Sequence, residues 1–204
     1  MKNLISKNNL EMDNNSKNIS IVKIYKEANP EKRFEIMLGN FNDFPREVNR
    51  AEKKIQFRIK SEKEWARQSI KGGLGTPVQT SSLSDRTANE AISNVLLEEA
   101  FKTGNIDKSI LKGIEGASEI EEEIKMIRIM RMDFELLEGL MQNLSELDSR
   151  IMIKRFVEKK YYKEIACEEH TNYDSVKRRI KALCRMLKEE IIEYLEMNCK
   201  DIKL

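Results

Sequence analysis

Residues Leu144 to Arg185 read LSELDSRIMIKRFVEKKYYKEIACEEHTNYDSVKRRIKALCR. Apolar residues recur there at helical spacing on both sides of a short polar break, at Tyr162, Ile165 and Ala166 before it and at Val176, Ile180, Leu183 and Leu187 after it. The break ends at Asn172, whose side-chain oxygen suits the N-cap of the second helix. Two short helices that meet across a turn of three or four residues form a helix-turn-helix, whose second helix fits the major groove of DNA.

The charges of this stretch predict which face of the second helix would meet DNA. When the apolar stripe turns inward, polar and basic side chains lie outside and at the front of the helix, within reach of base edges and phosphates. The candidate contact residues are Asn172, Tyr173, Asp174, Ser175, Lys177, Arg178 and Lys181. Between Arg150 and Lys188, 12 Lys and Arg residues stand against 5 Asp and Glu residues, about +7, whereas the whole chain carries +2. This asymmetry is typical of a DNA-binding module; a helical hairpin with a solvated basic surface is the alternative.

The same stretch resembles region 4 of bacterial sigma factors, the module that reads the promoter −35 element. The resemblance covers about 42 residues and is carried by Leu144-x-x-Leu147, Arg150, Tyr162-Lys163-Glu164-Ile165-Ala166 and Ser175-Val176-Lys177-Arg178-Arg179-Ile180. Three positions depart from the family pattern. Glu169 and His170 stand where the family usually has Leu-Gly, and Asn172 replaces the usual Ser cap. His and Asn tolerate the positive φ of such a turn better than most residues other than glycine, so the fold is expected to persist.

A second, looser resemblance spans about Glu64 to Arg185. A Gly/Pro/Ser loop followed by Ser84-Asp-x-Thr-Ala-Asn-x-Ala91 precedes the region-4-like end. This order is similar to that of the small sigma-like regulators of phages and prophages in Gram-positive bacteria, of which the RinA/ArpU-type late-gene activators are the nearest family. The resemblance implies binding to promoter DNA and contact with bacterial RNA polymerase.

Composition predicts an all-α protein with a modest core, because 35% of its 204 residues are charged, 6% are aromatic and only three are proline. No membrane helix and no signal peptide are predicted, so we expect a cytoplasmic location. Cys167 and Cys184 flank the predicted helix-turn-helix core, where we expect them to behave as small buried hydrophobes. With a single histidine and no ligand cluster, no catalytic site, metal or cofactor is predicted.

The chain divides into five predicted regions. These are a disordered N-terminus at 1–20, a basic helical region at 21–71, a Gly/Ser/Thr-rich linker at 72–84, an acidic helical region at 85–143, and the helix-turn-helix domain with its C-terminal helical extension at 144–204. From Asp85 to Asp148, 15 acidic residues stand against 7 basic ones, about −8. The Ile21–Tyr25 segment is short and β-branched, but we expect a helix or an apolar clip because no partner strand is evident.

Four longer helices are expected from start signals and apolar spacing. The first runs from Pro45 to about Lys71 with a stripe at Val48, Ala51, Ile55, Ile59 and Trp65. The second begins at Ser84-Asp85 and runs through Ala91, Val95, Leu96 and Ala100. The third spans Ser118 to about Met141 with a stripe at Ile120, Ile124, Ile127, Met130, Phe134, Leu137 and Met141. The last extends through Leu187, Ile191 and Leu195 to about Met197, and its apolar face must pack on the body of the protein or on a second copy.

Three functional hypotheses follow. The first is a transcription activator that binds double-stranded promoter DNA and works with RNA polymerase; a homodimer is one possibility. The second is a DNA-packaging protein, such as a small terminase subunit, that uses the same module and assembles into rings. The third is a structural helical protein without a specific ligand.

Basic side chains of the Pro45–Lys71 helix form a second surface that would strengthen DNA binding without adding sequence information, or else are simply solvated.

Overall fold

The computed structural model describes residues 20–71 and 86–201. The predicted linker at 72–84 and, except for Ser20, the predicted disordered segment at 1–20 lie outside these residues. Within them the chain is helical and contains no strand, which confirms the all-α expectation. The elements are, in order, α1 (Ile21–Glu27), α2 (Pro30–Gly39), α3 (Phe44–Lys71), α4 (Arg86–Thr103), α5 (Ala117–Gln142), α6 (Glu146–Met152), the π-helical turn η2 (Ile153–Val157), α7 (Tyr162–Glu168) and α8 (Tyr173–Asp201).

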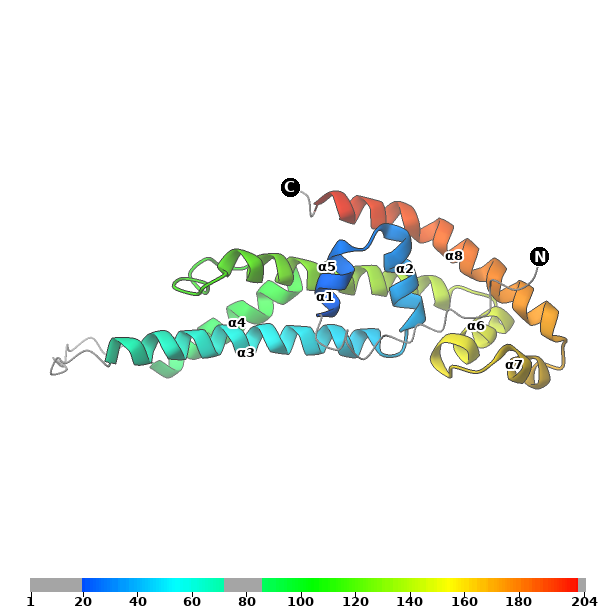
Figure 1. Cartoon of the computed structure of the whole chain (residues 1–204), viewed down its shortest axis with the longest axis horizontal. Coiled ribbons are helices and arrows are strands. Elements are labelled where there is room, and N and C mark those ends of the chain that lie inside the picture. The colour runs from blue at the N-terminus through cyan, green and yellow to red at the C-terminus, as the bar shows by residue number, and fades with distance from the viewer. Residues whose placement is uncertain (1–19, 72–85, 202–204) are drawn as a thin grey trace, which may run out of the picture.

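The molecule is elongated, with α3 and α5 lying along its long axis (Figure 1). Helix α5 is central, because α1, α3, α4 and α8 all pack against it. Helices α6 and α7 lie at one end of the molecule, and the outer halves of α3 and α4 lie at the other. The α6–α7 region and the outer halves of α3 and α4 are therefore far apart.

The first two helices are short and lie close together in the sequence. Residues Ile21–Tyr25 are helical, as part of α1, and not a strand. Helix α2 starts behind Asn29, whose side chain accepts a hydrogen bond from the backbone N–H of Lys32 at 2.8 Å, while Pro30 occupies the first helical position. Local capping chemistry therefore sets the start of α2.

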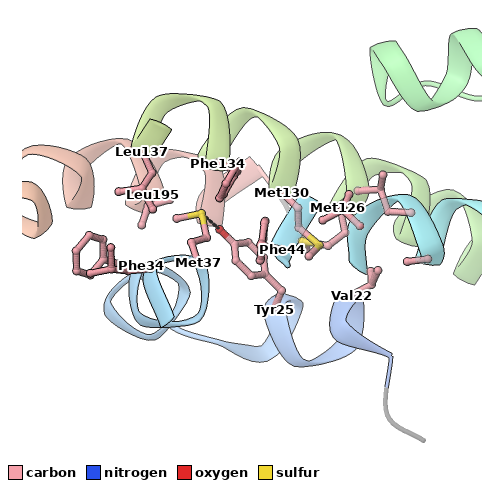
Figure 2. Close-up of a cluster of buried hydrophobic side chains, with 14 of the residues drawn as sticks. Val22, Tyr25, Phe34, Met37, Phe44, Met126, Met130, Phe134, Leu137 and Leu195 are labelled. Carbon is pink, nitrogen blue, oxygen red and sulfur yellow. Dashed lines mark hydrogen bonds between the residues drawn. The ribbon is translucent and has the colours of Figure 1, made fainter. Parts of the chain in front are cut away.

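One hydrophobic core runs through all the described helical regions. All seven residues of the predicted α5 stripe are buried, so this stripe packs inside the molecule. Around it lie apolar residues of α1, α2, α3 and α8 (Figure 2). Phe134 stacks on Phe44 with 5.3 Å between the ring centroids. The N-terminal helices are thus joined to α5 by direct packing.

Two predicted stripes are wrong in part. Trp65 is 72% exposed, although Val48, Ala51, Ile55 and Ile59 are all buried. It follows Ile59 by six residues, a spacing that rotates it off the inward face of α3. In α4, predicted Ala100 is buried, but Ala91 and Val95 are exposed, and the helix buries Leu97 and Phe101 beside Ala100. The predicted stripe was out of phase with the side of α4 that α5 covers.

The extension of α8 packs on the body of the protein, against α2 and α5. Leu187, Ile191 and Leu195 are fully buried. Near its end, Asn198 donates a hydrogen bond to Asp133 Oδ1 at 2.6 Å, and Tyr25 Oη donates to Asp133 Oδ2 at 2.8 Å. Burial raises the pKa of Asp133, although both hydrogen bonds favour its charged form. This carboxylate therefore joins α1, α5 and α8 inside the core.

Among residues 20–71 and 86–201, no helix has both the length and the apolar character needed to cross a membrane.

Candidate nucleic-acid interface

Helices α7 and α8 form a pair with a small shared core. Ile165 and Ala166 of α7 are buried, as are Val176, Ile180 and Leu183 of α8. Both helices pack on the segment before them, α7 on η2 and α8 on α6. The inward face of α8 is the one that the apolar spacing predicts, so the opposite face is left to solvent.

The turn between the two helices is closed by backbone hydrogen bonds. The N–H of Thr171 donates to the carbonyl of Ala166 at 2.9 Å, and the N–H of His170 donates to that of Cys167 at 3.3 Å. His170 has φ of +50°, so it takes the left-handed position where helices commonly end in glycine. Asn172 then caps α8, because its Oδ1 accepts from the N–H of Ser175 at 2.7 Å. The expected positive-φ histidine and asparagine cap are both confirmed.

Glu169, at the start of the turn, has a side chain only 7% exposed. Its carboxylate accepts from Arg150 Nη2 at 3.0 Å and from Lys154 Nζ at 2.6 Å. The hydrogen bonds of these two cations lower the pKa of Glu169 from 4.5 to about 2. A buried carboxylate with two cations therefore occupies the position where the resemblance leads us to expect leucine, and it ties α7 to α6 and η2.

Other ion pairs in this segment hold the same elements together. Glu168 binds Lys154 at 2.8 Å and Lys160 at 2.7 Å, which lowers the pKa of Glu168. Asp148 of α6 pairs with Arg179 of α8, and this contact lowers the pKa of Asp148. Much of the positive charge counted between residues 150 and 188 is thus balanced inside the protein and is not displayed to a ligand.

The predicted contact residues lie together at the start of α8. Tyr173, Asp174, Arg178 and Lys181 are exposed, and Ser175 and Lys177 are half-buried. The Tyr173 ring meets Tyr162 edge to face at 6.0 Å, and Lys177 Nζ lies 5.5 Å from its centroid. Arg178 Nε donates to the carbonyl oxygen of Asp174 at 3.3 Å, within its own helix. Asn172 is at the same end but uses its side-chain oxygen as the helix cap.

The cations on this face differ from those behind it. Lys163, Lys177, Arg178 and Lys181 form no ion pair with any carboxylate in the described part of the chain. By contrast, Arg150, Lys154, Lys160 and Arg179 are all paired internally. Arg155 and Lys159 also have no carboxylate partner, but each donates to a backbone carbonyl oxygen, of Lys160 and of Gly39. The outer face of α8 and neighbouring Lys163 therefore carry four of the cations that no carboxylate neutralises.

Tyr161 and Lys163, at the start of α7, are exposed and were not predicted as site residues. The N–H of Tyr161 donates to Glu164 Oε2 at 2.6 Å, which fixes the start of the helix. Lys163 precedes the inward residue Ile165 by two positions, a helical spacing that predicts an outward side chain. Tyr161 is the N-cap residue of α7, so helical spacing gives no such signal for it. The expectation for the cysteines was wrong for Cys167, which is exposed. Cys184 is partly buried against the hydrophobic core, and this burial raises its pKa to about 11.

Within the described residues, no three His, Cys, Asp or Glu side chains gather in a group that could hold a metal ion. A comparison with known proteins found no match among protein-family models, curated proteins or solved structures.

Proposed function

We propose that this protein binds double-stranded DNA sequence-specifically through the outer face of α8. It would act as a sigma-region-4-like activator of phage or prophage genes, together with bacterial RNA polymerase. The observation that carries the DNA-binding proposal is the cluster of polar and basic side chains on the first turns of α8. Lys177, Arg178 and Lys181 have no internal carboxylate partner there, whereas Arg150, Lys154, Lys160 and Arg179 behind them do. The polymerase and phage parts of the proposal rest on the family resemblance.

The geometry of the helix pair supports this proposal in three ways. The Asn172 cap and the closed turn fix the direction in which α8 leaves α7. The inward face of α8, with Val176, Ile180 and Leu183, is buried, so only the outer face can contact a ligand. Its first turns carry Arg and Lys, which can bind guanine edges and phosphates, and Tyr and Asp, which can contact bases.

The direct test begins with the purified chain and a pool of random duplexes, from which bound sequences are selected and a consensus site is derived. Fluorescence anisotropy then compares the consensus site with a scrambled duplex at a fixed salt concentration, because affinities depend steeply on salt. We expect tighter binding to the consensus. Failure to enrich any sequence over several rounds would contradict the proposal.

Arg178→Ala tests whether α8 reads bases. The arginine is expected to contact base edges, so its loss should weaken binding to the consensus by about 1–3 kcal/mol. Binding to the scrambled duplex should weaken much less. Lys102→Ala is the matched control, since Lys102 is an exposed cation in the last turn of α4, which lies away from the first turns of α8. Equal losses on both duplexes would show that Arg178 touches only phosphate.

Chromatin mapping in the native host separates activation from packaging. For an activator, we expect a bound site just upstream of a phage gene block whose transcripts rise. A bound site at a packaging start, with unchanged transcripts and assembly of the purified protein into rings, would favour the small-terminase alternative.

A further inference from the structure

The α3–α4 pair forms a layer with one side buried and one side bare. Ile55 and Ile59 of α3 are buried, as are Leu97 and Ala100 of α4, and both helices pack on α5. Residues about two positions away on a helix point to the opposite side. The outer side of this layer, away from α5, is therefore the side that carries Phe57 of α3 and Val95 of α4.

This outer side is unusually apolar for a surface. Phe57 is 73% exposed, Val95 is 63% exposed and Ile92, one turn before Val95, is 56% exposed. Ala91 lies beside them and is also exposed. The small side chain of Ala91 allows a second helix to approach closely, and the three large side chains would gain from being covered.

A hollow lies next to this apolar ridge. It has a volume of about 490 Å³ between α3 and α4, and its lining includes Phe57, Ile59, Leu97 and Ile110. In addition, none of the described side chains from 60 to 68 of α3 or from 88 to 96 of α4 is buried. The outer halves of these two helices thus lie side by side without a core between them.

We infer that this face binds the same face of a second copy of the chain, so that two α3–α4 layers stack into a four-helix bundle about a two-fold axis. Ile92 and Val95 of each copy lie in the hollow of the other copy. Such an interface is self-complementary, as a two-fold contact must be. We call residues Phe57, Ala91, Ile92 and Val95 the outer ridge.

Charge favours a second copy as the occupant. Exposed Lys53 and Lys60 lie beside the ridge on α3, while exposed Glu90 and Glu98 lie beside it on α4, and all four line the hollow. Lys60 already pairs with Glu90 at 3.4 Å within the chain. Two-fold stacking places α4 of each copy over α3 of the other, so acidic and basic edges meet twice.

The size of the face sets the strength of the dimer. Two helices of about 10 Å diameter over about 13 residues, at 1.5 Å each, cover about 400 Å² in projection per copy. The two copies together would cover about 800 Å², which is below the range of stable specific complexes and is typical of weak, transient ones. We therefore expect a concentration-dependent dimer with a dissociation constant in the micromolar range. The helix-turn-helix lies at the other end of the molecule, so each dimer presents two of them (Figure 1).

Sedimentation equilibrium of the full chain between about 1 and 100 µM tests the inference. The wild-type protein should shift from monomer to dimer over this range, and Val95→Glu should remain monomeric with an unchanged circular dichroism spectrum. Met197→Glu is the matched control, because Met197 is 61% exposed on α8, away from the outer ridge. It should dimerise like the wild type, and raised salt should weaken dimerisation of both.

Three results would overturn the inference: a wild-type protein that stays monomeric throughout, a Val95→Glu variant that dimerises as the wild type does, or assembly into larger rings. Because Val95 is exposed, its replacement should leave the fold intact, and Ile92→Glu repeats the test at a second ridge position. The result is independent of DNA binding, so it can fail while the proposed function holds, or hold while that function fails.

Discussion

Replacing Glu169 by glutamine removes one charge from the turn of the helix-turn-helix and keeps the shape of the side chain. In the wild type this carboxylate is almost completely buried and bound by Arg150 and Lys154. Both cations keep another carboxylate in the variant, Glu146 for Arg150 and Glu168 for Lys154. The variant therefore loses the negative charge that accepts hydrogen bonds from two cations, without leaving either cation alone.

The magnitude follows from the pKa of Glu169, which falls from 4.5 to about 2 on folding. A difference of one in pKa corresponds to about 1.4 kcal/mol, so the upper limit is roughly 3 kcal/mol. Arg150 is 48% exposed, and solvent screening of its charge reduces this to about 1–2 kcal/mol at pH 7. For a chain of this length we expect a fall of about 2–6 °C in the melting temperature.

Urea unfolding, followed by circular dichroism from pH 7 down to about pH 2.5, measures this difference. Because the pKa of Glu169 is lowered in the folded state, its contribution is fully present above pH 4.5 and is lost as the pH falls toward 2. The gap between wild type and Glu169→Gln should therefore be largest at neutral pH and should shrink steadily below pH 4.5.

Glu146→Gln is the control for this experiment. Glu146 is almost fully exposed and reaches Arg150 only at 3.6 Å, so this variant should match the wild type at every pH. Equal stability of Glu169→Gln and wild type at pH 7 would refute the reasoning. So would a difference between them that stays constant from pH 7 to pH 2.5.

Two further substitutions test the turn and the core. His170→Gly should raise the free energy of unfolding by up to about 1 kcal/mol, because glycine adopts a φ of +50° without strain; His170→Ala, which keeps the Cβ atom, should show no such gain in the same urea titration. Tyr25→Phe should lower the free energy of unfolding by about 1–3 kcal/mol, since it removes a donor from fully buried Asp133. An unchanged melting temperature for Tyr25→Phe would show that Asp133 finds another partner.

Much of the fold could be predicted from the sequence, because local rules set it. The Asn29 and Asn172 caps mark helix starts through hydrogen bonds that span three residues. The α5 stripe has the period of a helix buried on one face, and the structure buries all of it. Spacing failed where a helix has apolar residues on more than one side, as at Val95, because periodicity alone does not say which side a neighbour covers.

The sequence by itself determined the helices, their caps, the inward face of α8 and the side chains that α8 displays. Only the tertiary structure decided which charges are available to a ligand. Arg150 reaches Glu169 across 19 residues, and Arg179 reaches Asp148 across 31. Such pairs depend on how separate helices pack together, and no regular spacing of residues in the sequence indicates them. The same is true of Asp133, whose partners Tyr25 and Asn198 come from opposite ends of the described sequence and meet only because α1 and α8 pack on α5.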